Sequence, residues 1–247
     1  MGFSSFAWRC VAQRRRRRVS SAGLALGLLI LLLGPATVGT DAGLLSAQPD
    51  WLEHEFWIEL EPVAQPTEEY PLDRREAAER VLEEARYVYS AMVFGMRFRY
   101  VPLDLARRID EEFELSPVSE LPWGDPAIRV RESRRAEGRL WARVRYTLRE
   151  HELRRLNAWA SSRVPVAAGR GEASLLGGWT AKREAIEDAM RLAIREHVRA
   201  RVYNKPREIR GRLALYEPPR VFLRSGSYVA QVRVRLEIEA VEPYAVY

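Results

Sequence analysis

The sequence predicts an α+β protein made of two similar units, each with one helix laid on an antiparallel sheet. Residues 73–94 and 180–202 repeat apolar side chains every three or four positions, which is typical of helices that cover a core. Residues 139–148 and 228–241 alternate apolar and polar side chains, which is typical of strands with one buried face. The order helix, strand, turn, strand therefore occurs twice along the chain.

The first helix has a recognisable beginning and end. Asp73 is a suitable N-cap because a glutamate follows three residues later, and Gly95 is well placed to end the helix. Residues 96–101 then alternate large apolar side chains with Arg97 and Arg99. This segment is predicted to be a strand with one apolar face and one arginine face.

Shorter elements are predicted around this first helix and strand. Residues 56–60 are expected to form a short strand, and residues 103–113 and 149–160 two helices. Residues 128–132 are expected to pair with the strand at 139–148 through a polar turn that contains a glycine.

The second half begins with a predicted linker. Residues 161–178 are rich in glycine, alanine and serine and contain no clear periodicity. Thr180 is the expected N-cap of the second long helix. Two short strands at 211–216 and 220–223 follow, and a turn at 225–227 leads into the last strand.

The amino-terminal segment has the features of an export leader. Arg14 to Arg18 precede the apolar run Ala22 to Leu33, and small residues follow, as in a secretory signal peptide. Counted over 19–38, the apolar segment has about 20 residues, which is enough to span a bilayer if it is retained. Cleavage and retention both stay open. In either case the body is expected to be exported, periplasmic or extracellular, and retention would tether it to the inner membrane.

These observations give four predicted regions. Residues 1–47 are the signal peptide or signal anchor, and residues 48–160 are the first α+β unit. Residues 161–178 are the linker, and residues 179–247 are the second α+β unit.

The net charge and the cysteine count exclude several classes of function. The chain has 40 basic and 34 acidic residues, a formal charge of +6, but residues 1–47 hold six of the arginines and one aspartate. The body is therefore at +1 and has no net attraction for a phosphate backbone, so no nucleic-acid partner is expected. Cys10 is the single cysteine and lies in the leader, so the body has no disulfide.

The repeated element order predicts an internal duplication. The segment Arg74–Ala77 aligns with Lys182–Ala185, and RLWARVRYTL at 139–148 aligns with SYVAQVRVRL at 227–236. The alternative is that any two amphipathic helices and any two alternating strands look alike. Agreement in order as well as in local sequence favours duplication.

A proline-aspartate-tryptophan segment at 49–51, an alanine-rich helix over 181–193 and an alternating hairpin resemble small bacterial envelope domains. The resemblance is to the twenty-kilodalton outer-membrane lipoprotein family and to the amino-terminal domain of the flagellar T-ring protein. It implies a non-enzymatic envelope or motility-associated role and offers no catalytic residue. The chain departs from the lipoprotein pattern because Cys10 precedes the apolar run.

No catalytic, cofactor-binding or metal-binding residue is predicted, and no cofactor is expected. His54, His151 and His197 are far apart and lack the spacing of metal ligands. The chain has no nucleophile elbow of the G-x-S-x-G type and no phosphate-binding loop.

Some arginines and tryptophans are candidates for an interaction surface. Arginine on a strand face can bind anions or acidic partners, but it also keeps an exposed sheet soluble. Tryptophan near a loop can serve an interface or pack at a junction. The candidate interface residues are Arg97, Arg99, Trp123, Trp159, Arg233 and Arg235.

The predicted function is that of an exported, non-enzymatic binding or structural module of the cell envelope, with motility as the context that the resemblance implies. Its expected partner is an envelope protein or an acidic cell-surface polymer. Two alternatives remain. One is a secreted hydrolase that uses carboxylates at the junction of the two units, and the other is an assembly factor tethered by an uncleaved leader.

Overall fold

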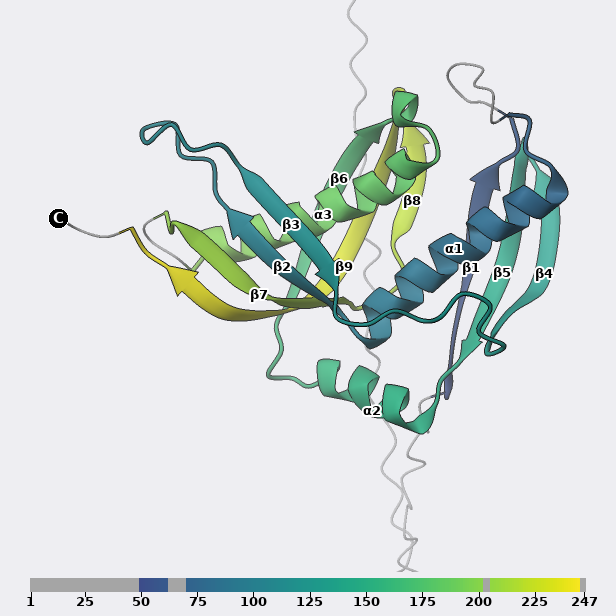
Figure 1. Cartoon of the computed structure of the whole chain (residues 1–247), viewed down its shortest axis with the longest axis horizontal. Helices are drawn as coiled ribbons and strands as arrows, with labels where there is room; N and C mark the ends of the chain where they lie inside the picture. The colour runs from purple at the N-terminus through teal and green to yellow at the C-terminus, as the bar shows by residue number, and fades with distance from the viewer. Residues whose placement is uncertain (1–48, 62–69, 202–204, 245–247) are drawn as a thin grey trace, which may run out of the picture. The chain divides into compact units, whose positions relative to one another are not determined.

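A computed structural model describes residues 49–61, 70–201 and 205–244 of the chain (Figure 1). The predicted leader, residues 1–47, lies outside these residues. Within the described part, no helix has the length and apolar character needed to cross a membrane. The elements in chain order are β1 (Trp51–Glu59), α1 (Arg74–Val93), β2 (Met96–Val101), β3 (Glu112–Pro117), β4 (Ile128–Ala136), β5 (Arg139–Thr147), α2 (Glu150–Trp159), β6 (Val166–Ser174), a 3₁₀ turn at Leu175–Gly177, α3 (Thr180–Arg199), β7 (Glu208–Leu215), β8 (Arg220–Arg224) and β9 (Ser227–Glu242).

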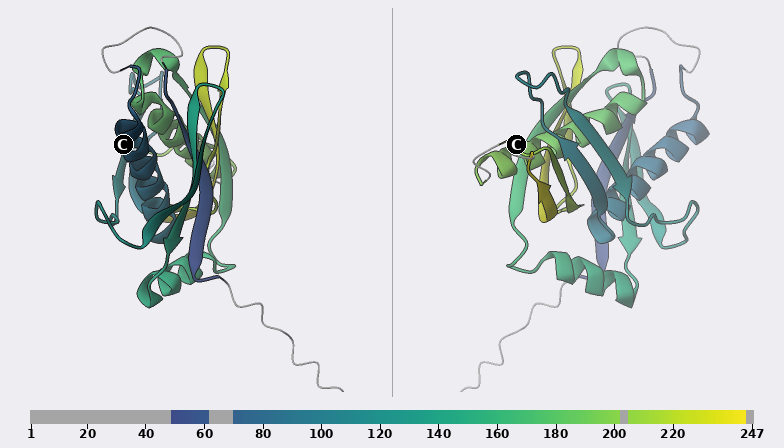
Figure 2. Two further views of the ribbon diagram at one scale, coloured as in Figure 1. Left: turned by 90° about the vertical axis from the view of Figure 1, so that its right-hand side faces the viewer. Right: turned by 60° about the vertical axis from the view of Figure 1, so that its left-hand side comes forward.

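The strands form two antiparallel sheets, which confirms the predicted α+β class. Sheet A has the strand order β1-β5-β4. Sheet B has the order β3-β2-β7-β9-β6, and β8 pairs with the first part of the long strand β9. Figures 1 and 2 show α1 lying along sheet A and α3 lying against β6 and β9 of sheet B.

The helix α1 begins and ends as the sequence predicts. The Asp73 carboxylate accepts the backbone N–H of Glu76 at 2.7 Å, and the Glu76 carboxylate accepts the Asp73 N–H, which completes a capping box. Gly95 follows the helix with a φ of 76°, a conformation that glycine adopts without strain. The buried side of α1 packs on sheet A, where the Tyr89 hydroxyl donates to the Val144 carbonyl at 2.6 Å.

Two hairpins share the same tight turn. Glu137 and Gly138 join β4 to β5 with φ values of 56° and 69°, and Ser225 and Gly226 join β8 to β9 with φ values of 50° and 79°. Two consecutive residues with positive φ are the signature of the type I′ turn, whose twist suits a two-residue hairpin. Both turns were expected from the glycine in each segment.

The predicted linker at 161–178 is wrong, because residues 166–174 form strand β6, which pairs with β9 along its whole length. The small side chains serve close packing. A Cβ on Gly169 would lie 2.0 Å from the backbone O of Ala189. A Cβ on Gly171 would lie 2.1 Å from the backbone N of Ala189. The backbone of α3 therefore rests directly on β6, an approach that only glycine allows.

Two local predictions are also wrong. Residues 103–113 form a turn closed by a bridge between Asp104 and Ile109, followed by β3, instead of a helix. The Asp104 carboxylate accepts the N–H of Arg107, and Arg108 has a φ of 57°, which ends any helical path. Thr180 does not cap α3 but is its first residue, and its hydroxyl donates to the Gly177 carbonyl.

The two predicted units share one sheet. Strand β2 of the first unit pairs antiparallel with β7 of the second, with Met96 opposite Leu213. All described residues belong to a single compact unit. The pairing order β1-β5-β4 in the first unit matches the order β6-β9-β8, in which β6 comes from the predicted linker and β8 and β9 from the second unit. The internal duplication itself stays a prediction.

Candidate functional site

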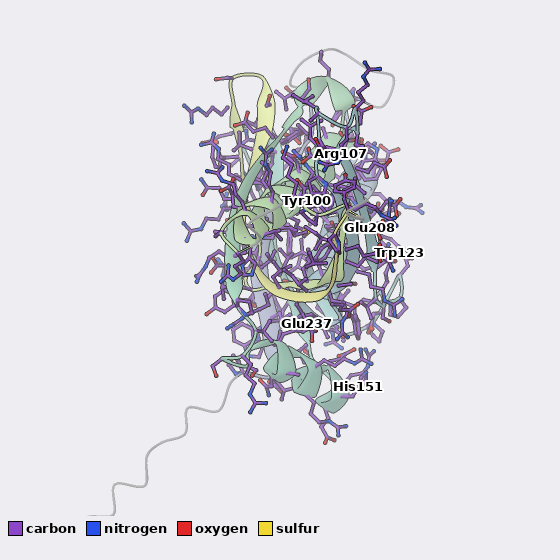
Figure 3. The ribbon with its side chains drawn as sticks, turned by 90° about the vertical axis from the view of Figure 1, so that its left-hand side faces the viewer. Tyr100, Arg107, Trp123, His151, Glu208 and Glu237 are labelled. Carbon is purple, nitrogen blue, oxygen red and sulfur yellow. The ribbon has the colours of Figure 1, made fainter. Side chains whose placement is uncertain are left out.

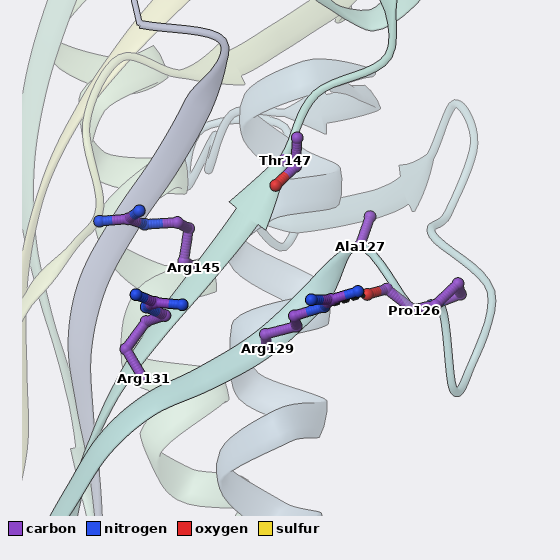
Figure 4. Close-up of a pocket in the computed structure, with 6 residues that line it drawn as sticks. All are labelled: Pro126, Ala127, Arg129, Arg131, Arg145 and Thr147. Carbon is purple, nitrogen blue, oxygen red and sulfur yellow. Dashed lines mark hydrogen bonds between the residues drawn. The ribbon is translucent and has the colours of Figure 1, made fainter.

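Sheet A has a pocket on the face that points away from α1 (Figure 4). We call it the arginine pocket. Its volume is about 430 Å³, and it lies where β4 and β5 meet the end of the loop before β4. Its lining residues are Pro126, Ala127, Arg129, Arg131, Arg145 and Thr147.

Antiparallel pairing brings the arginines together. Arg129 of β4 lies directly opposite Arg145 of β5. Side chains of such a pair point to the same face, and like charges in these positions destabilise a sheet. Val144 and Tyr146, which flank Arg145 on β5, face α1 and are fully buried. The core therefore fixes the register, and the register forces the two guanidinium groups onto one face.

A β-bulge adds the third arginine. The register between β4 and β5 shifts between Val130 and Glu132, so Arg131 is an extra residue without an opposite partner. Bulges turn a side chain away from the regular alternation. Arg131 thereby joins Arg129 at the pocket, and Glu132 still pairs with Arg143 at 3.2 Å.

Two of the three arginines are held in place. Arg129 donates its Nε–H to the Pro126 carbonyl at 3.0 Å, as the dashed line in Figure 4 shows. Arg145 donates its Nε–H to the Glu53 carboxylate at 2.7 Å, and its guanidinium lies 4.4 Å from the ring centre of Trp51. Each of these contacts uses Nε, so the terminal guanidinium nitrogens stay available to a ligand.

The pocket has an excess of positive charge. Arg134 forms a two-oxygen contact with Glu55 at 2.9 and 3.0 Å elsewhere on the same face. Among the described residues, neither Arg129 nor Arg131 has a carboxylate partner. The three arginines of the pocket are therefore balanced by one glutamate, and the site is suited to an anionic group.

A buried carboxylate fixes the loop that borders the pocket. Asp125 accepts two hydrogen bonds from Arg149, at 2.8 and 3.0 Å, and one from the Ala127 N–H at 3.0 Å. Burial acts to raise the pKa of Asp125, but the Ala127 N–H and the Arg149 guanidinium outweigh it and lower this pKa. The loop therefore presents Pro126 and Ala127 to the pocket from a fixed position.

Arg97 and Arg99 lie on the outer face of sheet B, and Arg99 is held in internal ion pairs. Arg99 pairs with Glu112, Glu114 and Glu208 at 2.8 to 3.1 Å. Glu208 and Glu237, labelled in Figure 3, belong to the same mixed ladder of charges on this sheet. Arg97 is exposed and lies opposite Arg212. This surface is close to charge balance, unlike the arginine pocket.

Arg233 and Arg235 on β9 surround one tyrosine. Their guanidinium carbons lie 4.6 and 4.8 Å from the ring centre of Tyr216. Arg235 also donates to the Val164 carbonyl at 2.9 Å, and Arg233 lies 3.8 Å from Glu217. These contacts favour a structural role for both arginines.

The two predicted tryptophans differ in exposure. Trp123 is 59% exposed and, with Trp179, lines a hollow of about 460 Å³ beside the outer face of α1. It is labelled in Figure 3. Trp159 is half-buried at the end of α2, and its ring lies against Gly95. Trp123 remains a candidate for an interface, whereas Trp159 packs α2 onto the end of α1.

The histidines lie on separate elements, with His54 on β1, His151 on α2 (Figure 3) and His197 on α3. Burial lowers the pKa of His54 and of His197. Within the described ranges, no group of three or more histidine, cysteine or acidic side chains is arranged to hold a metal ion.

The junction of the two units has buried charges, and carboxylates of both units also meet on shared arginines, Glu112 with Glu208 on Arg99 and Glu111 with Asp188 on Arg191. Glu59 is 2% exposed, and Lys182 is 4% exposed and bonds to Glu84. Burial raises the pKa of Glu84, against the opposing effect of Lys182. A hydrolase needs carboxylates that its substrate can reach, and the alternative of a hydrolase at the junction stays a prediction.

The fold and the site define an α+β protein with an arginine-lined pocket on a three-stranded sheet. A protein-family model matches residues 42–244, and the chain belongs to that family. The chain is 29% identical over 199 residues to an uncharacterized protein of Treponema pallidum (strain Nichols), in an alignment that covers 78% of this chain and 81% of that relative. No solved structure matches the chain. The whole arginine pocket lies inside the region that the family model covers.

Sequence reasoning did not find the arginine pocket. The available signal was the pair of Arg-Val-Arg segments at 129–131 and 143–145, on two strands joined by a hairpin turn. Placing them on one face requires the register of the hairpin and the position of the bulge, which the sequence pattern alone does not define.

Proposed function

We propose that the protein is an exported, non-enzymatic binding or assembly module of the cell envelope, which holds an acidic partner at the arginine pocket. The observation that carries the proposal is that Arg129, Arg131 and Arg145 line one hollow, with Glu53 as the one carboxylate that pairs with them among the described residues. Export is supported by the leader-like segment at 1–47.

The chemistry of the pocket supports binding over catalysis. Its lining residues offer three guanidinium groups and the hydroxyl of Thr147, which can attract and orient an anion. An imidazole or carboxylate that could transfer a proton is not among these lining residues. An acidic polymer or an acidic protein surface is the class of partner that this site favours.

Two finer statements belong to the same proposal. The likeness to envelope and flagellar domains supports a place near the motility apparatus. The matching strand orders of β1-β5-β4 and β6-β9-β8 support an origin of the body by internal duplication.

The proposal is tested by capture of partners from envelope extracts. The wild-type chain and the double variant Arg129→Gln, Arg131→Gln would be compared as bait, with Arg135→Gln as control because Arg135 is exposed on the same strand but outside the pocket. We expect an acidic partner that the wild type and the control retain and the double variant loses. Retention should also fall as salt rises, since screening weakens exposed charge interactions. Equal capture by all three chains would contradict the proposal.

A further inference from the structure

We propose that the arginine pocket recognises a phosphate group carried on a small organic moiety. This inference rests on the proposed function, because it names the chemical class of the acidic group that the same pocket takes.

The number of donors favours phosphate over carboxylate. A guanidinium can bind a carboxylate through two parallel hydrogen bonds, and on this sheet a single nitrogen of Arg134 already contacts both oxygens of Glu55, so one arginine is enough to engage one carboxylate. Three guanidinium groups and the Thr147 hydroxyl supply more donors than one carboxylate accepts. A phosphate group has three or more oxygens in a tetrahedral arrangement and can receive donors from several directions.

The charge of the pocket is consistent with this choice. Glu53 neutralises one of the three arginines through its contact with Arg145, which leaves an excess of two positive charges. A phosphate monoester carries about two negative charges near neutral pH. A phosphodiester carries one negative charge, so one of the two excess positive charges of the pocket would be left for a neighbouring acidic group.

The size of the pocket and its walls indicate more than a free ion. A volume of about 430 Å³ falls in the range of small-molecule sites, roughly 300 to 1,000 Å³. Pro126 and Ala127 form an apolar wall beside the arginines. Soluble glycerol phosphates and the headgroups of anionic phospholipids both combine a phosphate with a small organic part of this kind.

The like-charged pair provides a test of the binding role of these arginines. Arg129 and Arg145 lie directly opposite each other, an arrangement that costs stability when no anion is present. A glutamate at position 129 would face Arg145 as an opposite charge. Arg129→Glu is therefore expected to raise the melting temperature of the free protein at low salt and to abolish phosphate binding. A purely structural role of Arg129 would give the opposite change in stability.

The test measures ligand binding by the purified full-length chain with calorimetry and thermal denaturation. The ligands are inorganic phosphate, glycerol 3-phosphate, vesicles of phosphatidylglycerol and, as carboxylate control, succinate at equal ionic strength. Phosphatidylcholine vesicles control for membrane binding without net charge. We expect glycerol 3-phosphate or phosphatidylglycerol to bind at least about tenfold more tightly than succinate, and inorganic phosphate to raise the melting temperature.

The variants assign the binding to the pocket. Arg129→Gln with Arg131→Gln should weaken phosphate binding at least about tenfold, because charge-assisted hydrogen bonds are lost, whereas Arg135→Gln should not change it. A response to glycerol 3-phosphate alone identifies a soluble phosphate, and a response to phosphatidylglycerol identifies a lipid headgroup.

Two outcomes would overturn the inference. Equal binding of succinate and phosphate would contradict the preference for phosphate, but it would still agree with the proposed function, in which the pocket binds an acidic partner. Phosphate binding that the double variant retains would show that the phosphate occupies another site. Conversely, phosphate binding at the pocket without any envelope partner in the capture experiment would leave the inference standing and count against the proposed function.

Discussion

Lys182 and Glu84 form a buried ion pair between α3 and α1, with Nζ and Oε2 2.6 Å apart. The same ammonium group donates to the Trp57 carbonyl at 2.6 Å and lies 4.0 Å from the ring centre of Trp57. Trp57 lies on β1, at the free edge of sheet A, so one side chain of the second unit connects two elements of the first.

Lys182→Met should destabilise the protein by about 3 kcal/mol, because it leaves a buried carboxyl and a carbonyl without their partner. Urea denaturation would measure the change in unfolding free energy. Lys205→Met is the matched control, since Lys205 is the other lysine of the chain and its bond to the Leu103 carbonyl is exposed. A loss below about 0.5 kcal/mol for Lys182→Met would show that the pair is not needed for the junction.

Asp125→Asn should lower stability at neutral pH and make it less dependent on pH. The pKa of Asp125 is lower in the folded protein than in the unfolded chain, so its contribution to stability is present above about pH 4 and is lost as pH falls through the folded pKa. We expect the variant to lose about 1 to 3 kcal/mol at pH 7. The difference from the wild type should shrink toward pH 3.

Unfolding free energies measured from pH 7 to pH 3 would test this prediction. Asp110→Asn serves as control because Asp110 is exposed. Parallel pH curves for Asp125→Asn and the wild type would contradict it.

Gly171→Ala should destabilise the body by about 3 kcal/mol, because the new methyl group would overlap the backbone of α3 near Ala189. The melting temperature is the measurement. Ala168→Ser, on the exposed face of the same strand, should change stability by less than about 0.5 kcal/mol. If both variants melt together with the wild type, α3 does not rest on β6 as closely as described.

Trp123→Ala and Trp159→Ala should separate an interface residue from a packing residue. Trp123 is largely exposed, so its removal is expected to change unfolding free energy by less than about 0.5 kcal/mol. Trp159 lies against Gly95, and its removal should cost about 2 kcal/mol. Thermal denaturation of both variants would measure the two losses of stability. A larger loss for Trp123→Ala than for Trp159→Ala would refute the assignment of Trp123 to an interface and of Trp159 to packing.

The leader hypothesis predicts a processed amino terminus in the native host. Cleavage after Ala42 or Ala47 follows from the small residues beyond the apolar run. Mass spectrometry of the protein isolated from the envelope would identify the first residue. A chain that begins near Met1 would favour the retained anchor.

The sequence predicts the parts of this fold that depend on local periodicity. The helices α1 and α3 and the strands β2, β5 and β9 appear close to their expected positions, because each buries one regular face. Strand β6 was missed because its glycines and alanines resemble a linker, and their reason is the distant backbone of α3. The turn at 103–113 depends on the Asp104 side chain, which a helical pattern does not reveal.

The candidate site was less accessible to prediction than the fold. Alternation correctly placed Arg97 and Arg99 on an outer face, but it does not show that the Arg99 charge is already neutralised by glutamates of β3 and β7. The arginine pocket depends on the pairing of Arg129 with Arg145 and on the bulge at Arg131. Both the pairing and the bulge depend on the register between β4 and β5, which the pattern of either strand alone does not define.

The pairing of β2 with β7 has a consequence for any attempt to divide the chain. A cut between α2 and β6 would separate these two strands and leave each piece with an uncovered edge of matching register. Such edges recombine readily, so the fragments should reassociate, and a strained hinge in this region would favour exchange of halves between two molecules.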